Sequence, residues 1–143
     1  MTQSTFPDHF SAVAGNYADF RPTYPPALFS WLATLMLAHD LAWDCAAGSG
    51  QASVDLAGHF DRVVATDASA RQIAAAQSHP KVEYRVAPAE ESGLADASVD
   101  LLAVAQALHW FDLDRFYAEA RRVLKPAGVI AVWTYGVLLL DDP

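Results

Sequence analysis

One stretch decides the fold of this chain: Leu41-Ala42-Trp43-Asp44-Cys45-Ala46-Ala47-Gly48-Ser49-Gly50, an apolar run that leads into a turn of small residues. The run Leu41 to Ala46 predicts a first strand, and the following residues, Gln51 to Ala57, predict a helix closed by Gly58. Two glycines after a strand allow a tight turn and the close approach of a ligand to the backbone. Such turns also follow strands for steric reasons alone, so the turn by itself leaves open whether a ligand binds here.

Strands and helices alternate after this turn. Further strands are predicted at Arg62–Thr66, Lys81–Val86, Val99–Ala105 and Val129–Trp133. Helices are predicted over Ala27–Ala38, from a capping box of Ser69 and Gln72 to about Ser78, and after the cap Asp112 as far as Leu124. This alternation predicts an α/β fold with a mainly parallel sheet covered by helices on both faces. In such a sheet a ligand binds beyond the carboxyl ends of the strands.

Two of the predicted helices carry apolar residues on one face at helical spacing. The first would turn Leu28, Leu32, Leu35 and Met36 toward the core. The last would turn Leu113, Phe116, Tyr117, Ala120 and Leu124 toward the core, before Pro126 and Gly128 end it.

The composition limits the classes of partner. With 143 residues, 53% of them hydrophobic, the chain suits one globular domain. Its formal net charge of −8, with nine scattered Lys and Arg residues, disfavours nucleic acid and favours a small-molecule ligand. No apolar run approaches the roughly 18 residues needed to cross a bilayer, so no membrane is expected. Cys45 is the only cysteine, which excludes an internal disulfide, favours a small core residue at this position and fits a cytoplasmic location.

The second predicted strand ends in Asp67, whose carboxylate can accept hydrogen bonds from both hydroxyls of a ribose. Asp67 can instead begin a turn, Asp67-Ala68-Ser69, and cap the next helix. A ribose site beside a glycine turn suits either a dinucleotide or S-adenosylmethionine. The third glycine of the dinucleotide fingerprint would fall at Ser53, and Asp44 puts negative charge where the phosphates would lie. S-adenosylmethionine, with a positive sulfonium and a positive α-amino group, fits this charge better.

Several segments, in order along the chain, match the motifs of one enzyme family. They are Tyr17–Pro22, Asp44–Gly50, Asp67, Ala87–Glu90, Ser98–Phe111 and Arg122–Gly128. Together they span about Phe10 to Tyr135 and resemble the class I, Rossmann-like S-adenosylmethionine-dependent methyltransferases, in the type 11 and trans-aconitate-methyltransferase-like group. The chain departs from the family pattern twice: the first motif has Ala46 where glycine is usual, and the chain stops at Pro143, before the family's sixth and seventh strands.

The resemblance implies a three-layer αβα sandwich with sheet order 3-2-1-4-5. Residues 1–40 would form a helical arm or lid, and residues 41–143 would form the core that binds S-adenosylmethionine. The implied cofactor contacts are Tyr17, Arg21, Asp44, Ala46, Gly48, Gly50, Asp67, Ala68, Ala89, Glu90 and Gln106. Among them, Arg21 would hold the methionine carboxylate by a charge-assisted contact, and Ala89-Glu90 would border the adenine.

His109 follows the fourth predicted strand, where the reacting methyl group should point, and could act as a base near neutral pH. A hydroxyl acceptor needs such a base, whereas a carboxylate acceptor does not. The expected reaction is O-methylation of a carboxylate or hydroxyl on a small molecule. Two other functions stay open: a nucleoside-binding module without activity, and a nicotinamide-dependent oxidoreductase. The other histidines show no metal-ligand spacing.

The end of the chain bears on association. Without the family's later strands, the fifth predicted strand would have an exposed edge, and Val137–Leu140 adds an apolar tail. An unpaired edge is a template for pairing with another chain. We therefore expect a homodimer through this edge or poor solubility, unless the sequence is a fragment of a longer protein.

Overall fold

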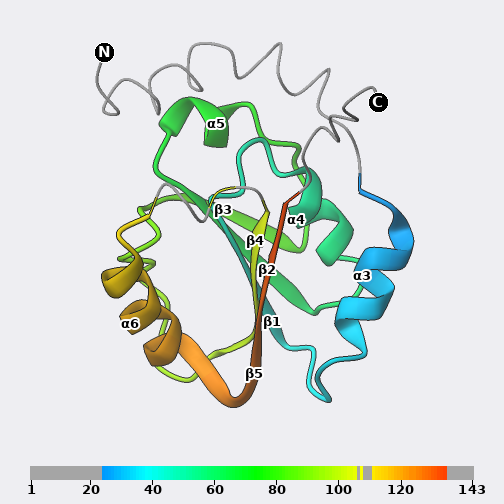
Figure 1. The fold of residues 1–143 in the computed structure, drawn as a ribbon. Coiled ribbons are helices and arrows are strands. Elements are labelled where there is room, and N and C mark those ends of the chain that lie inside the picture. The colour runs from blue at the N-terminus through cyan, green and yellow to red at the C-terminus, as the bar shows by residue number, and fades with distance from the viewer. Residues whose placement is uncertain (1–23, 106, 108–110, 135–143) are drawn as a thin grey trace, which may run out of the picture.

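The computed structural model of the chain describes residues 24–105, 107 and 111–134 (Figure 1). In chain order, its helices and strands are α3 (Pro26–Ala33), β1 (Leu41–Cys45), α4 (Gln51–Leu56), β2 (Arg62–Asp67), α5 (Ala70–Ala74), β3 (Val82–Val86), β4 (Val99–Ala105), α6 (Leu113–Val123) and β5 (Leu124–Trp133). Helices and strands alternate as predicted, and between β3 and β4 the described chain forms a loop without a helix.

All strands of the sheet run parallel, in the order β3-β2-β1-β4-β5. This order confirms the predicted α/β class and Rossmann-like topology. β1 lies at the centre of the sheet, where Asp44 pairs with Ala65 of β2 and with Ala103 of β4. Because the strands are parallel, the carboxyl ends of β1, β2 and β4 meet at one edge, where ligands of such sheets bind.

Helices cover both faces of the sheet and form two separate cores (Figure 1). On one face, Phe29 of α3 and Leu56 of α4 share a cluster with Ala42 of β1. On the other face, Phe116 of α6 lies beside Trp43 of β1, with the ring centroids 6.4 Å apart. Successive side chains of a strand point to opposite faces, so β1 contributes to both cores. The predicted three-layer αβα sandwich is confirmed.

Helix α3 is shorter than predicted. It ends at Ala33 instead of Ala38, because the N–H and the hydroxyl of Thr34 both donate to the Trp31 carbonyl, at 3.0 and 2.6 Å. Such local bonds compete with the continuation of a helix. Leu35, predicted to face the core, is 41% exposed, whereas Met36 is buried in the core cluster on this face, as predicted.

The boundary between α6 and β5 also differs from the prediction. Leu124 does not continue the helix, because its backbone is extended and it pairs with Val99 of β4. Pro126 keeps the next residue, Lys125, out of the helix as well, since a proline disfavours helical backbone at the residue before it. The register with β4 shifts between Val99 and Leu101. At this shift Gly128 comes so close to β4 that a Cβ would lie 2.9 Å from the Val99 carbonyl oxygen.

The buried face of α6 is rotated from the predicted one. It consists of Phe116, Glu119, Ala120 and Val123. Leu113 and Tyr117, predicted to face the core, are 44% and 37% exposed.

None of the helices in the described ranges combines the length and the apolarity that crossing a membrane requires.

A buried carboxylate fixes the start of β1. Asp100 Oδ2 of β4 accepts hydrogen bonds from the N–H groups of Asp40 and Leu41, at 2.9 and 3.0 Å. Asp100 Oδ1 lies 2.9 Å from Lys125 Nζ of β5, which also contacts Asp40 Oδ2. These carboxylates, chiefly Asp100, raise the pKa of Lys125. Asp100 therefore joins β1, β4 and β5 at the amino ends of the strands.

We expect Asp100→Asn to lower the free energy of unfolding by about 1–3 kcal/mol, because the amide cannot replace both acceptor oxygens of a buried carboxylate. Asp40→Asn is the matched control: it removes the same charge beside Lys125, but from a side chain that is 68% exposed rather than 4%. An exposed ion pair contributes little, so its effect should be far smaller. Urea denaturation measures both, and equal losses would contradict the role given to Asp100.

Candidate functional site

The turn after β1 has left-handed backbone at three residues. The φ angles of Ala46, Gly48 and Gly50 are 57°, 59° and 83°. The Ala47 N–H donates to the Thr66 carbonyl of β2 (2.9 Å), and the Gly50 N–H donates to the Ala47 carbonyl (3.0 Å). Glycine adopts this conformation freely, whereas it costs an alanine about 1–2 kcal/mol. The alanine that departs from the family motif therefore occupies a strained position.

Tyr84 of β3 covers this turn, a contact that no sequence pattern indicates. A Cβ on Gly50 would lie 2.5 Å from Tyr84 Oη, so any other residue here would displace the Tyr84 side chain as well as strain the backbone. The Tyr84 hydroxyl donates to the Gln77 carbonyl (2.5 Å), and the Gln77 N–H donates to the Ser49 carbonyl (3.3 Å). Burial raises the pKa of Tyr84, and the Asp44 carboxylate raises it further.

The carboxylate of Asp67 anchors the turn. It accepts hydrogen bonds from the Gly48 N–H at Oδ2 (2.9 Å) and from the Ser69 N–H at Oδ1 (2.8 Å). Asp67 thus lies at the carboxyl end of β2 as predicted, beside the glycines. Its role in forming the turn Asp67-Ala68-Ser69 is observed, with Ala68 exposed between the other two. Contact with a ribose stays a prediction.

Ser69 begins α5 through half of the predicted capping box. Its hydroxyl accepts the Gln72 N–H (3.3 Å), but its own N–H is bound by Asp67 rather than by the Gln72 side chain. Gln72 is 5% exposed, and its Oε1 has no hydrogen-bond partner in the described part of the chain. The helix ends at Ala74, earlier than the predicted end near Ser78.

Asp44 lies next to the turn and is 1% exposed. The Ser53 hydroxyl of α4 donates to Asp44 Oδ2 (2.6 Å). Dinucleotide-binding folds use their third glycine at this position for close packing of helix on strand. Here a hydroxyl and a carboxylate occupy that contact and keep a negative charge beside the turn. This arrangement favours a cationic ligand over a pyrophosphate, and direct contact of Asp44 with a ligand stays a prediction.

The thiol of Cys45 shows the electrostatic character of this edge. Cys45 is fully buried, which confirms the predicted core role, and burial raises the pKa of its thiol well above 9.0. The carboxylates of Asp44, Glu90 and Asp67 raise this pKa further. Glu119 of α6 acts in the same direction, so four acidic residues from four different segments disfavour ionisation of this thiol.

The loop between β3 and β4, residues 87–98, brings Ala89 and Glu90 to the same edge. At its start, the Ala87 N–H donates to the Asp67 carbonyl (3.0 Å). Ala89 is 8% exposed and belongs to the core cluster on the α6 face. Glu90 Oε2 accepts the N–H of Asp112 at the start of α6 (2.9 Å). The structure thus places both residues beyond the strand ends, as predicted, and their contact with an adenine stays a prediction.

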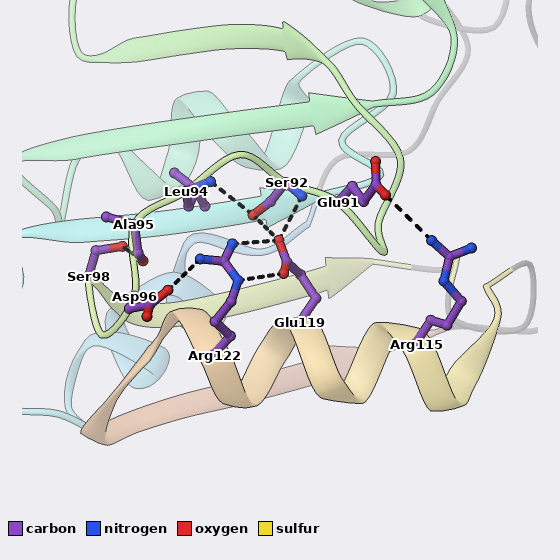
Figure 2. Close-up of polar contacts among 9 residues, drawn as sticks. All are labelled: Glu91, Ser92, Leu94, Ala95, Asp96, Ser98, Arg115, Glu119 and Arg122. Atoms are coloured by element: carbon purple, nitrogen blue, oxygen red, sulfur yellow. Dashed lines mark hydrogen bonds and ion pairs between the residues drawn. The ribbon is translucent and has the colours of Figure 1, made fainter.

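A buried carboxylate of α6, that of Glu119, holds the same loop (Figure 2). It accepts hydrogen bonds from the N–H and the hydroxyl of Ser92, at 2.8 and 2.6 Å, and forms an ion pair with Arg122 at 2.8 Å. The bonds from Arg122 and then Ser92 lower the pKa of Glu119 from 4.5 to about 2. The sequence held one signal for this residue: Glu119 follows Phe116 by three positions, and residues at that spacing share a helix face.

Four predicted site residues lie outside the described residues: Tyr17, Arg21, Gln106 and His109. Their roles as donor contacts and as a base stay predictions. The structure brings the remaining ones together at one edge of the sheet: Asp44, Ala46, Gly48, Gly50, Asp67, Ala68, Ala89 and Glu90. Within the described ranges, no three His, Cys, Asp or Glu side chains are grouped so that they could hold a metal ion.

Residues 43–132 match the family described as the methyltransferase domain. This match covers more than half of the chain and includes the glycine turn, Asp67 and the loop that carries Glu90. The chain belongs to the methyltransferase domain family. Methyltransferases of this family use S-adenosylmethionine as the methyl donor. This is the cofactor predicted from the sequence.

Similar proteins support membership of the methyltransferase family. A protein of Dictyostelium discoideum named as a methyltransferase is 43% identical over 99% of this chain and 54% of its own length. A solved structure from Anaeromyxobacter dehalogenans, described as a type II methyltransferase, is 55% identical with a TM-score of 0.80, covering 86% of this chain and 52% of its own.

One solved complex is similar in fold alone. It is phosphoethanolamine N-methyltransferase 1 of Haemonchus contortus with phosphoethanolamine and S-adenosylhomocysteine, which is 22% identical with a TM-score of 0.68 over 92% of this chain and 33% of its own. The chain spans about half the length of the curated relatives that it matches.

We expect Ala46→Gly to raise the free energy of unfolding by about 0.5–1 kcal/mol, because relief of the left-handed strain exceeds the entropy that glycine adds to the unfolded chain. The control is Ala47→Gly, a buried neighbour outside the left-handed region, which should lower the free energy of unfolding. Denaturant titrations of the two variants give the comparison. Loss of stability in both variants would show that the turn is not strained at Ala46.

Proposed function

We propose that this chain forms the S-adenosylmethionine-binding part of a methyltransferase that transfers a methyl group to a carboxylate or hydroxyl oxygen of a small molecule. The observation that carries the proposal is the group of carboxylates around the left-handed turn. Asp67 bonds to the Gly48 N–H, and Asp44, Glu90 and Asp67 all act on the thiol of Cys45. A negative edge of this kind attracts a cationic ligand and repels a pyrophosphate.

The residues at this edge fit the donor in both shape and charge. A carboxylate has about four acceptor positions, so anchoring the turn is compatible with accepting a ribose hydroxyl at Asp67. Ala68 is exposed directly after Asp67, and the loop that carries Ala89 begins with the bond from the Ala87 N–H to the Asp67 carbonyl. In our proposal Asp67 binds the ribose, Ala89 and Glu90 border the adenine, and the acidic edge lies nearest to the sulfonium and the α-amino group.

The bound donor supplies an activated methyl group for in-line displacement at the sulfonium carbon. The protein then has to align the acceptor with that carbon and exclude water. The acceptor would lie beside the segment after β4, which carries Gln106 and His109. His109 would accept the proton of a hydroxyl, whereas a carboxylate acceptor would need no base.

Charge and cysteine use support the remaining parts of the proposal. The net charge of −8 disfavours a nucleic-acid acceptor and leaves a small molecule as the substrate. The one cysteine is buried and unpaired, which is compatible with a reducing cytoplasm.

The test is a calorimetric titration with S-adenosylhomocysteine and, separately, with NAD. We expect binding of the nucleoside only, and Asp67→Asn should weaken it by about tenfold or more, because a charge-assisted bond to the ribose is lost. Asp61→Asn, an equal charge change directly before the amino end of β2, should leave the affinity unchanged. Preference for NAD would overturn the proposal.

Incubation of labelled donor with carboxylate and hydroxyl acceptors then tests transfer, and binding without transfer would identify a binding module.

We also propose that the chain pairs with a second copy through β5. Among the described residues β5 is hydrogen-bonded to β4 alone, and Ile130 and Val132 are 37% and 44% exposed. An open apolar edge of this kind favours strand pairing between chains.

We expect a dimer at micromolar concentration in size-exclusion chromatography with light scattering. Val132→Lys should give a monomer, because an edge lysine opposes strand pairing. Leu113→Lys on α6, where the leucine is equally exposed at 44%, should leave the dimer intact. A monomeric wild-type protein would refute the pairing.

A further inference from the structure

The loop of residues 87–98 is held to α6 by a buried charged group (Figure 2). Glu119 Oε2 accepts both the N–H and the hydroxyl of Ser92, and Ser92 Oγ in turn accepts the Leu94 N–H at 3.1 Å. Glu119 is 8% exposed and Ser92 is 2% exposed. One carboxylate oxygen therefore determines the backbone path on both sides of Ser92.

Arg122 completes the contact with the second half of the loop. Its Nε and Nη2 donate to the two oxygens of Glu119, at 2.8 and 2.9 Å, and its Nη1 donates to Asp96 Oδ1 at 2.7 Å. At the end of the loop, the Ala97 N–H donates to the Arg122 carbonyl (2.9 Å). The bidentate pair orients the Glu119 carboxylate as well as neutralising it.

The first half of the same loop carries the residues proposed for the base of the donor. It begins at the Asp67 carbonyl, bound by the Ala87 N–H, and Glu90 contacts the start of α6 through Asp112. Ser92 lies two residues beyond Glu90. The loop is therefore fixed at Asp67 on one side and at Glu119 on the other, with Ala89 and Glu90 between these two points.

Added stability alone does not explain why a carboxylate is buried between α6 and the loop. A buried carboxylate loses its hydration, and an apolar residue of similar volume is often as stabilising as a buried ion pair. Exposed ion pairs elsewhere on the loop, such as Arg115 with Glu91 at 3.6 Å, cost no such desolvation. A buried, directional group is better suited to holding one loop conformation.

We propose that Glu119 is a positioning residue for adenine recognition: through Ser92 it holds Ala89 and Glu90 at the distance from Asp67 that an adenosine requires. This inference rests on the proposed function, because it assumes that the edge binds the nucleoside of S-adenosylmethionine. Glu119 acts through the loop and has no contact with the ligand in this proposal.

The experiment compares Glu119→Gln with Glu91→Gln. Both changes remove one negative charge from a contact of the same loop, but Glu91 is 74% exposed whereas Glu119 is buried. Each variant and the wild type is titrated calorimetrically with S-adenosylhomocysteine and with S-inosylhomocysteine, in which an oxygen replaces the adenine amino group. The ratio of the two dissociation constants measures recognition of the base, separately from the ribose and the amino acid part.

We expect the wild type to prefer the adenine ligand and Glu119→Gln to reduce that preference by about fivefold or more, since a displaced loop no longer matches the edge of the base. Glu91→Gln should keep the wild-type preference. Ser92→Ala should reduce it in the same direction, and the double variant Ser92→Ala with Glu119→Gln should add little further, because the two residues act as one unit. Faster hydrogen exchange at the Ser92 and Leu94 amides of ligand-free Glu119→Gln should accompany the change.

The possible failures are distinguishable. If the wild type binds neither nucleoside, the proposed function itself fails. If the wild type binds but has no base preference, or if Glu119→Gln weakens both ligands equally, Glu119 is structural only and the inference is overturned while the proposed function stands.

Discussion

The hydrogen bond from the Gly48 N–H to the carboxylate of Asp67 connects the two strands on which the site depends. It joins the turn after β1 to the end of β2, and the same carboxylate also accepts the N–H of Ser69, the residue that caps α5. The left-handed backbone at Gly48 points its N–H at Asp67, and this geometry is one that glycine adopts without strain. Without this contact, the glycine turn would lack its side-chain anchor at the edge where the sheet binds ligands.

Negative charge accumulates around that anchor. Asp44 comes from β1, Asp67 from β2 and Glu90 from the loop before β4, and all three disfavour ionisation of the Cys45 thiol. Like charges that lie close together repel each other, so this grouping lowers the stability of the ligand-free protein. A bound ligand of opposite sign would offset that cost. A donor with a sulfonium and an ammonium group has that sign. A glycine turn alone suits a phosphate as well as S-adenosylmethionine. The negative charges around the turn are what favour the cationic donor.

Buried carboxylates recur in this fold with a single structural purpose. Asp100 binds two backbone N–H groups at the amino end of β1, Asp44 binds the hydroxyl of Ser53, and Glu119 binds Ser92. In each case an acidic side chain on one element determines where a neighbouring element or loop lies. Hydrogen bonds give direction, which apolar packing of the two cores does not supply.

Local pattern was enough to determine the class of fold and the strand that ends in Asp67, because apolar periodicity and turn residues act over a few neighbouring positions. The strand order was predicted from the resemblance to a family, since local pattern does not say which strands are neighbours. Element ends were less accurate: the helix after Pro26 stops at Ala33 through the side chain of Thr34, and Leu124 joins a strand because Val99 is there to pair with it. Tertiary structure alone decided that Tyr84 covers Gly50, that Asp100 binds the residues before β1 and that Glu119 is buried against Ser92. Those partners are separated by 60 positions for Asp40 and Asp100 and by 27 for Ser92 and Glu119. No local signal specifies such pairs, since they meet only after the parallel sheet has set which strands and helices are neighbours.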